Sequence, residues 1–324
     1  MNIRIAICGY GNLGRGVEHA AMRAPDIPPA AIFARRPPEP LRTQASVPVL
    51  PISALRHWRE QIDVLILCGG SAKDLPRQTP TFAADFNTVD SFDTHAAIPA
   101  HFAATDRAAS ASGHLALISA GWDPGLFSVA RTLFDAFLPD GETATFWGRG
   151  VSQGHSDALR RIPGVLDARE YTVPIDGVAE AAEAGQVQPL PPTATHRREC
   201  YVVAADGADR DRIVRAICGM PDYFRGYETS VTFLSQAELN RDHAALPHGG
   251  KVIRSGKTGE DRQLLTLGAK LASNPEFTGS VLVAYARAVY RLRKGGRTGC
   301  ITPLDVPPAA LSPLPPDSLR KKLL

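Results

Sequence analysis

The stretch IRIAICGYGNLG, residues 3–14, is the part of the sequence that most directly indicates the fold class. A short apolar run ends directly in a G-x-G-x-x-G pattern, and residues 15–24 that follow have a helical composition. Glycines at these positions let the backbone approach a pyrophosphate, and the helix N-terminus offers N–H groups and the positive end of its dipole. The predicted dinucleotide contacts are Gly9, Tyr10, Gly11, Asn12, Leu13 and Gly14. The alternative is a glycine turn in a nucleotide-free domain.

Strand and helix signals go on alternating through the first 120 residues. Apolar, strand-like runs cover 30–36, 62–70, 86–90 and 115–119, and the run at 62–70 is bounded by glycines as a buried parallel strand would be. This alternation predicts a Rossmann-type, doubly wound parallel α/β sheet. We expect residues 1–120 to form this domain, completed by a C-terminal segment of about 275–324 that contains a long helix over 275–296.

The pattern changes after Gly121. Residues 142–148, 169–174, 198–205 and 227–234 are typical of longer, half-exposed strands, and residues 208–220 of a helix between them. The sequence therefore predicts an α+β substrate-binding and dimerisation domain over 121–274, with a mostly antiparallel sheet. The Pro-rich tail from Pro303 is expected to be irregular.

Composition excludes several classes of protein. A net charge of +3 over 324 residues gives no reason to expect nucleic acid or an anionic membrane as a partner. The five cysteines form no C-x-x-C pair, which favours free thiols in a reducing cytoplasm. No run reaches the length of a membrane span, and no cluster predicts a metal site.

The end of the second strand indicates which dinucleotide binds. NAD sites usually place a carboxylate there, but this chain has Ala34, Arg35 and Arg36. Guanidinium groups suit a 2′-phosphate, so NADP(H) is favoured, with surface arginines as the alternative. Ser71, in the Cys68–Ser71 loop after the next buried strand, is a candidate phosphate or ribose contact or an ordinary turn residue.

Polar residues gather in two further places. Asp93 and Asp123 follow predicted strands in VDSFDTH and SAGWDPG, where they could hold an ammonium group or cap a turn. Residues 147–165, WGRGVSQGHSDALRRIPGV, carry many polar groups and few apolar ones. Its His155, Asp157, Arg160 and Arg161 could brace a loop or lie on the surface.

These motifs together resemble the meso-diaminopimelate dehydrogenase family, NADP-dependent enzymes of lysine biosynthesis. The resemblance rests on IRIAICGYGNLGRG, TVDSFDTH, SAGWDPGLFS and, most distinctively, FWGRGVSQGHSDALRRIPGV. It continues through TATHRREC, MPDYFRGYE, LPHGGKVI and NPEFTGS, in the expected order from residue 3 to about residue 285. Ala34 stands where a serine is usual and Gly70 where a bulkier residue is usual.

The resemblance implies a substrate with two amino-acid ends, which explains the polar stretch at 147–165. It implies Asp93 and Asp123 at the reacting D-centre. Because the α-amine must be neutral before hydride leaves, a carboxylate or a water near one of these two residues is expected to take its proton. It further implies substrate contacts from Trp122, Trp147, Gln153, the N–H of Gly154, Thr172, Arg198, His248 and Asn274. Cofactor contacts are implied at Tyr10–Leu13, Ala34–Arg36, Cys68, Gly69, Gly70, Ser71, Ser91, Phe92, Asp93, Ala120, Gly121, Trp122, Asp123 and Pro124.

The expected reaction is oxidative deamination of the D-centre of meso-2,6-diaminopimelate by an isologous homodimer. Two alternatives stay open on the sequence. One is an NADP-dependent dehydrogenase of another D-amino acid or 2-oxo acid on the same scaffold. The other is a non-catalytic NADP(H)-binding sensor. Arg198 and His248 discriminate between a diamino-diacid and a monoacid substrate, because a monoacid needs no residues that bind a second amino-acid end. Taken alone, Arg198 could be a solvated arginine and His248 a turn histidine.

Overall fold

The computed structural model describes residues 2–35, 41–188, 190–221 and 223–324, and the chain divides into two units. The first unit comprises the chain up to Val129 together with Pro275–Leu324. The second comprises Ala130–Asn274. The division falls inside helix α4 (Leu126–Phe137), and the boundary predicted after residue 120 lies a few residues ahead of that helix.

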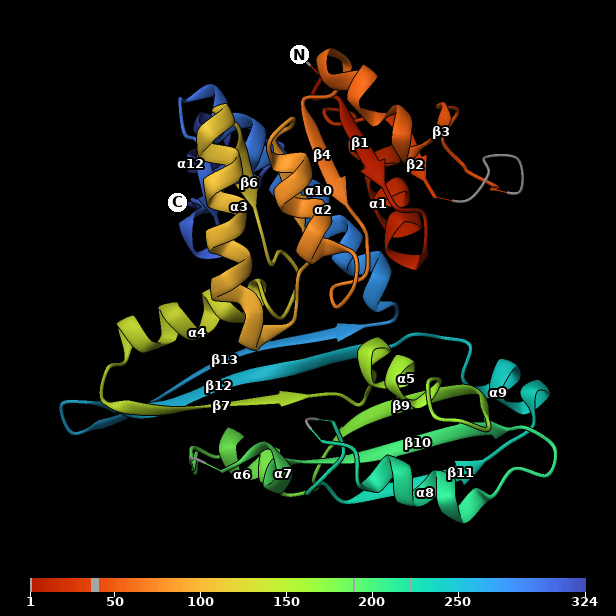
Figure 1. Ribbon diagram of the computed structural model, residues 1–324. Coiled ribbons are helices and arrows are strands. Elements are labelled where there is room, and N and C mark those ends of the chain that lie inside the picture. Colours follow the sequence, from red (N-terminus) through yellow and green to blue (C-terminus); the bar gives the residue numbers. More distant parts are fainter. Residues whose placement is uncertain (1, 36–40, 189, 222) are drawn as a thin grey trace. The chain divides into compact units, whose positions relative to one another are not determined.

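The first unit is built on a parallel sheet with strand order β14-β6-β5-β4-β1-β2-β3 (Figure 1). Its strands are β1 (Ile5–Cys8), β2 (Pro29–Ala34), β3 (Val49–Pro51), β4 (Val64–Leu67), β5 (Thr88–Asp90), β6 (Leu115–Leu117) and β14 (Gly299–Ile301). The neighbouring strands all pair in parallel. The chain reverses its direction of travel across the sheet between β1 and β4, so the loops after these strands form the crevice where doubly wound sheets bind ligands. The predicted Rossmann-type sheet is confirmed.

Helices cover both faces of this sheet. They are α1 (Asn12–Met22), the 3₁₀ helices η1 (Ile52–Gln61), η2 (His95–Ala97) and η3 (Pro303–Asp305), and α2 (Leu75–Ala83), α3 (Ile98–Ser112), α10 (Asn274–Lys294), α11 (Pro308–Leu311) and α12 (Pro316–Leu323). Alternate residues of β1 serve the two faces, as the strand repeat requires. Ile5 and Ile7 pack in one cluster with α1 and α10, while Ala6 and Cys8 pack in the other with η1 and α2.

Two glycines allow α1 and α10 to approach each other closely. A Cβ added to Gly16 would lie 2.4 Å from the carbonyl oxygen of Pro275, and one added to Gly279 would lie 2.3 Å from the carbonyl carbon of Gly16. Neither position tolerates a side chain without a shift of the backbone. Helix α10 of the C-terminal segment therefore packs in direct backbone contact with α1, the helix that follows the G-x-G-x-x-G turn.

The second unit contains two sheets in its described residues, with orders β11-β10-β9-β8 and β13-β12-β7. The strands are β7 (Gly141–Trp147), β8 (Gly150–Val151), β9 (Val165–Pro174), β10 (His196–Ala204), β11 (Thr229–Phe233), β12 (His248–Thr258) and β13 (Asp261–Leu271). The helices are α5 (Gln153–Leu159), α6 (Val178–Glu183), α7 (Pro192–Thr195), α8 (Arg210–Cys218) and α9 (Gln236–Asp242). Pairing is antiparallel except between β10 and β11, which confirms the mostly antiparallel character predicted.

Three elements differ from the sequence-based expectation. The β12–β13 hairpin was not predicted, although Gly259 at a φ of +62° marks its turn. Strand β3, which was not predicted, extends the parallel sheet by pairing with β2. The prediction that the tail from Pro303 is irregular is wrong in part, because helix α12 begins at Pro316. Proline is common at the first position of a helix.

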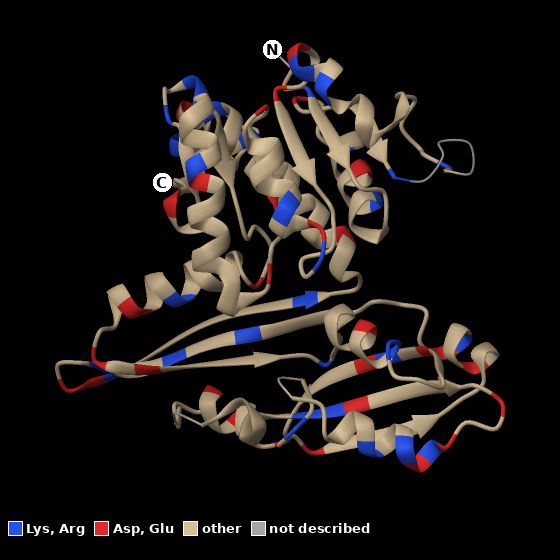
Figure 2. Ribbon diagram, in the orientation of Figure 1, with Lys and Arg blue, Asp and Glu red and all other residues tan. Residues whose placement is uncertain are grey.

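Charged residues of both signs are interspersed along the two units (Figure 2). This distribution agrees with the small net charge of +3. Within the described ranges, no helix combines the length and the apolar character needed to cross a bilayer.

Candidate functional site

The G-x-G-x-x-G turn has the geometry that its glycines predict. Gly9 adopts a φ of +100°, and its N–H donates to the carbonyl of Phe33 at 2.8 Å, which ties the turn to β2. A Cβ on Gly14 would lie 2.1 Å from the carbonyl oxygen of Gly9. Gly11 precedes α1 and no side chain caps that helix, so the N–H groups of its first turn are not engaged by a capping side chain. This arrangement fits a pyrophosphate.

A buried glutamate that the sequence analysis missed supports this turn. Glu18, fully buried in α1, accepts hydrogen bonds from the backbone N–H groups of Gln44 at 2.9 Å and Ala45 at 2.8 Å. It also accepts from the hydroxyl of Tyr10. Burial and this hydrogen bond raise the pKa of Tyr10 well above its ordinary value, so the phenol stays neutral. Glu18 therefore joins the segment after β2 to the glycine-rich turn.

Arg35 extends from the end of β2, where a 2′-phosphate would be recognised. Its side chain is 72% exposed, and its Nη1 lies 3.0 Å from Oδ1 of Asp74. Asp74 also accepts from the N–H of Gly70 at 2.9 Å, so this carboxylate links Arg35 to the loop after β4. Ala34 is buried, and Arg36 lies outside the described residues.

The loops after β4 and β5 are joined by hydroxyl groups. The Oγ of Ser71 accepts from the N–H of Asp93 at 2.9 Å and lies 3.3 Å from the Oγ1 of Thr94. Asp93 itself is exposed. The structure thus brings together the predicted residues Ser71 and Asp93, at the same edge of the sheet as the glycine-rich turn.

Asp90, at the end of β5, holds the backbone of two predicted cofactor loops. It is fully buried and accepts from the N–H groups of Phe92 at 3.0 Å and Ser119 at 2.9 Å. Its other oxygen pairs with Nε2 of His101 at 2.8 Å and accepts from Thr79 at 2.6 Å. Asp90 was not singled out from the sequence, where it only ends the predicted strand at 86–90, yet it fixes the loops that carry Ser91–Asp93 and Ala120–Pro124. In the second of these loops Trp122 is 6% exposed and Asp123 is half-buried.

The two thiols near this edge are not nucleophiles. Burial raises the pKa of Cys8 to about 12, and it raises the pKa of Cys68 further still. Both therefore stay protonated at neutral pH. In the described parts of the chain no three His, Cys, Asp or Glu side chains come together as metal ligands do.

In the second unit, strand register aligns several predicted substrate residues. Gly150 pairs with Thr172, Thr172 pairs with Arg198, and Arg198 pairs with Thr229, so these positions form one row across the four-stranded sheet. His248 packs against the start of this row, because a Cβ on Gly150 would lie 2.6 Å from its ring. Thr172, Arg198 and His248, which are far apart in sequence, are thus brought together.

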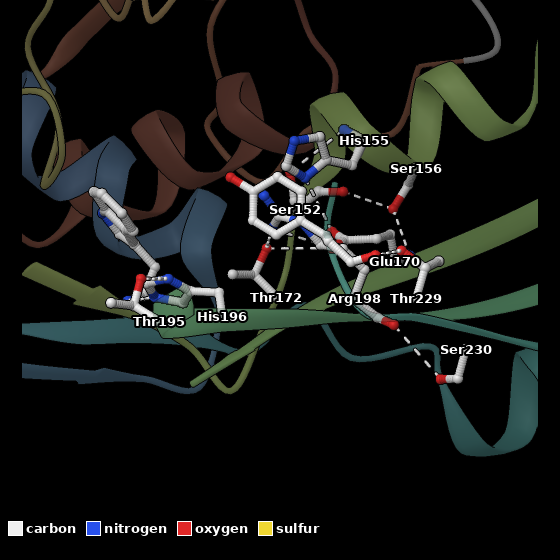
Figure 3. A network of polar contacts seen from close by, with 12 residues as sticks. Ser152, His155, Ser156, Glu170, Thr172, Thr195, His196, Arg198, Thr229 and Ser230 are labelled. Carbon is white, nitrogen blue, oxygen red and sulfur yellow. Dashed lines mark hydrogen bonds and ion pairs between the residues drawn. The ribbon is translucent and has the colours of Figure 1, made fainter. Parts of the chain in front are cut away.

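Arg198 is buried with one side of its guanidinium unpartnered. The side chain is 8% exposed, and its Nη1 contacts Thr172 and lies 3.4 Å from the Oε1 of Glu170 (Figure 3). Its Cζ lies 4.2 Å from the centre of the Tyr227 ring. The Nε is buried and has no hydrogen-bond partner among the described residues. A buried N–H without a partner costs free energy, so this edge of Arg198 is suited to an anionic ligand.

Glu170 is the second residue that the sequence analysis missed. It is fully buried, accepts from the hydroxyl of Thr172 at 3.3 Å, and lies 3.1 Å from Nδ1 of His155 (Figure 3). Its backbone N–H donates to Ser156 of α5 at 2.9 Å. Glu170 thereby connects the polar stretch at 147–165 to the row that contains Arg198.

The other predicted substrate residues of this unit, Trp147 apart, lie at the starts of two helices. Gln153 and Gly154 form the exposed first turn of α5. Asn274 begins α10 and donates its N–H to Leu246 at 2.9 Å.

Trp147 is held by a neutral histidine. The N–H of Trp147 donates to Nε2 of His196 at 2.8 Å. Burial, with the charge of Arg198 adding to it, lowers the pKa of His196 to about 4. At neutral pH the proton is therefore on Nδ1, which donates to Thr195 at 2.8 Å. The sequence analysis did not single out His196, although it orients the backbone at a predicted pocket wall.

This histidine predicts a loss of stability in acid. As pH falls from the ordinary histidine pKa of 6.5 to about 4, the unfolded chain gains a proton that the folded protein does not accept. The wild type should lose about 2 kcal/mol of unfolding free energy between about pH 7.5 and about pH 5 through this group alone. His196→Gln keeps an acceptor for Trp147 but cannot titrate, so it should lack this component. Urea unfolding of both proteins at the two pH values measures it; equal losses would contradict the assignment.

Comparisons with known proteins agree on one family. Residues 121–273 match the diaminopimelic acid dehydrogenase C-terminal domain. The chain is 52% identical to the meso-diaminopimelate D-dehydrogenase of Ureibacillus thermosphaericus over 323 residues, 99% of each protein. It is similar to the structure of Corynebacterium glutamicum DAP dehydrogenase in complex with DAP, with a TM-score of 0.95, 44% identity, and coverage of 100% of this chain and 99% of that one. An engineered D-amino acid dehydrogenase bound to NADP⁺ matches with a TM-score of 0.91 and 43% identity, over 100% of both chains.

Proposed function

Because the chain belongs to the meso-diaminopimelate D-dehydrogenase family, we propose that it oxidises the D-centre of meso-2,6-diaminopimelate with NADP⁺. The products are L-2-amino-6-oxopimelate and ammonia, and the reaction is reversible. It serves lysine biosynthesis. The subsites for the substrate and cofactor, and the roles of their residues, follow from this assignment and from the geometry of each unit.

The observation that carries the proposal is the buried, unpartnered Nε of Arg198. A substrate carboxylate would accept from this N–H, and charge-assisted contacts of this kind are among the strongest in proteins. Thr172 lies beside Arg198, and His248 packs against Gly150 in the same row, so these residues and Asn274 would hold the distal L-centre. A monoacid substrate would leave the buried N–H of Arg198 without an acceptor, which weighs against the alternative of another D-amino acid.

The reacting D-centre is assigned to Asp93 and Asp123. The α-ammonium must lose a proton before the C–H bond breaks, and either carboxylate, or a water it binds, would accept that proton. The hydride then leaves the α-carbon, the C–N bond becomes an imine, and water adds before ammonia departs. Trp122 and Trp147 would wall the pocket, and Gln153 with the N–H of Gly154 would bind near the carboxylate. The neutral His196 keeps the backbone of Trp147 in place for this role.

The residues of the first unit fit NADP. The nicotinamide supplies the hydride acceptor when it is bound. The Gly9–Gly14 turn and the uncapped start of α1 would hold the pyrophosphate, and Arg35 would pair with the 2′-phosphate. Arg36 is assigned to the same phosphate on the sequence alone. The loops at Cys68–Ser71, Ser91–Asp93 and Ala120–Pro124 would contact the rest of the cofactor, held by Asp90 and Ser71.

The chain is proposed to act as an isologous homodimer in the cytoplasm. The resemblance to the family supports the dimer, and β13 offers an edge strand with alternating exposed residues. Five free cysteines fit a reducing compartment. Sedimentation equilibrium of the purified protein measures the oligomeric state directly.

The function is tested by turnover. Purified protein is mixed with NADP⁺ and the meso, LL or DD isomer, and the absorbance of reduced nicotinamide is followed, with NAD⁺ in parallel. We expect turnover of the meso isomer, with NADP⁺ preferred by about a hundredfold over NAD⁺ in kcat/KM. Binding of NADP⁺ without turnover of any isomer would revive the sensor alternative.

A further inference from the structure

Glu170, in the second unit, is a fully buried carboxylate that has no assigned contact with the substrate or the cofactor. It lies in β9, two residues before Thr172, so both side chains point to the same face of the strand. Its Oε1 faces Arg198 and Thr172, and its Oε2 faces His155 (Figure 3). A buried carboxylate is costly to desolvate and is retained where its partners need it.

The contacts of Glu170 divide the guanidinium of Arg198 into two parts. Glu170 and Thr172 occupy Nη1, and Tyr227 covers one face of the group at 4.2 Å. Nε is buried and has no hydrogen-bond partner among the described residues. Because the fork of an arginine is rigid and planar, fixing one nitrogen and one face also fixes the direction of the Nε–H.

We propose that Glu170 is a positioning residue that aims the Nε edge of Arg198 at the distal carboxylate of the substrate. It acts through Arg198 and does not itself touch the ligand. By accepting from Nη1 it also holds the guanidinium before the ligand arrives, so the group does not turn toward another acceptor. This inference rests on the proposed role of Arg198 and deepens it, since it makes recognition of the L-amino-acid end depend on a residue beneath the site.

The second contact of Glu170 extends this role to the polar stretch. His155 is held between Oε2 of Glu170 at 3.1 Å and the rings of Tyr223 and Phe224, whose centres lie 5.3 and 5.8 Å from its own. The backbone of Glu170 also binds Ser156. One carboxylate and its own peptide group therefore fix both α5 and Arg198.

The test uses the full-length protein and a probe that needs no turnover. L-2-Aminopimelate carries the L-amino-acid end and lacks the reacting amine, and its Kd is measured by calorimetry. Glu170→Ala should raise this Kd about tenfold to a hundredfold, as expected for loss of hydrogen bonds to a charged group. Glu170→Gln keeps an acceptor for Arg198 and should stay within about threefold of wild type. Binding of NADP⁺ should be unchanged in both.

The matched control is Glu199→Ala. Glu199 lies next to Arg198 on β10, pairs with Arg149 and Arg197, and is not assigned to the site. Its replacement should leave the Kd of L-2-aminopimelate within about twofold of wild type. If meso-diaminopimelate is turned over, Glu170→Ala should raise its KM and change kcat little.

Several outcomes would overturn the inference. An unchanged Kd in Glu170→Ala, no rescue by Glu170→Gln, or an equal loss in Glu199→Ala would each do so, and so would failure of the wild type to bind the probe. Failure of the proposed function looks different: the probe binds and depends on Glu170, but meso-diaminopimelate is not oxidised.

Discussion

Replacing Arg198 by leucine is expected to lower kcat/KM for meso-diaminopimelate by about a thousandfold. The substitution removes the buried Nε–H and the positive charge proposed to bind the distal carboxylate, and it leaves the fully buried Glu170 without its cationic partner. Truncating one partner of a buried charge pair between a protein and its ligand costs about 2 to 5 kcal/mol of binding free energy, which corresponds to a factor of about thirty to a few thousand. Initial rates at varied substrate concentration measure the effect.

Arg198→Lys is the companion variant. It keeps a charge for Glu170 but has no planar fork, so it should recover only part of the loss. The affinity for NADP⁺ should stay that of the wild type in both variants, because the residues assigned to the cofactor lie in the other unit. A loss in Arg198→Leu smaller than about fivefold would show that the distal carboxylate is bound elsewhere.

Arg35→Ser is expected to lower the preference for NADP⁺ over NAD⁺ by about a hundredfold. The 2′-phosphate would lose a guanidinium fork, and hydrogen bonds to a charged group contribute about 1.5 to 3 kcal/mol each. NAD⁺ has no such phosphate, so its kcat/KM should change little. The ratio of kcat/KM for the two cofactors, measured at fixed ionic strength, gives the result.

A matched arginine in the same unit provides the control for Arg35. Arg4 lies just before β1 and pairs with Asp63 at 3.0 Å, the same distance as between Arg35 and Asp74. It lies at the opposite end of the sheet from the glycine-rich turn, so Arg4→Ser should alter neither cofactor. Equal losses with NADP⁺ and NAD⁺ in Arg35→Ser would mean that Arg35 supports the loop structure instead of reading the phosphate.

The sequence predicted those features of the fold that depend on residues close together in the chain. The turn at Gly9–Gly14 follows a buried strand, and its requirement for glycine is set by contacts within a few residues, such as Gly14 against Gly9. The parallel sheet followed from apolar runs separated by helices. Thr172 and Arg198 were predicted as substrate contacts because the sequence resembles that of a known family. The pairing of β9 with β10 places them side by side.

The buried carboxylates could not be predicted, because their role depends on register and on distant partners. Glu18, Asp90 and Glu170 look like ordinary surface or strand-end residues in the sequence. Each becomes significant only because the fold brings to it backbone N–H groups or side chains from other elements. His196 is similar, since its lowered pKa comes mainly from burial, which the sequence does not reveal, and the charge of Arg198 only adds to it.

The β12–β13 hairpin was missed for a related reason. Its strands contain glycines and charged residues, which lower strand propensity, and Gly256 is there because a side chain would lie 2.1 Å from the carbonyl oxygen of Asp140. A close approach between segments far apart in sequence leaves no periodic pattern. The hairpin carries His248 at its first residue, so this part of the candidate site also depended on tertiary structure.

In the proposed reaction the hydride leaves the D-carbon while the L-centre is held, and one isotope measurement tests this directly. Meso-diaminopimelate deuterated only at the D-α-carbon is oxidised with NADP⁺, and the NADPH and the product are analysed by mass spectrometry. Deuterium is expected in the NADPH and none in the L-2-amino-6-oxopimelate. Unlabelled NADPH with deuterium retained in the product would mean that the L-centre reacts, and the assignment of Arg198 to that centre would be contradicted.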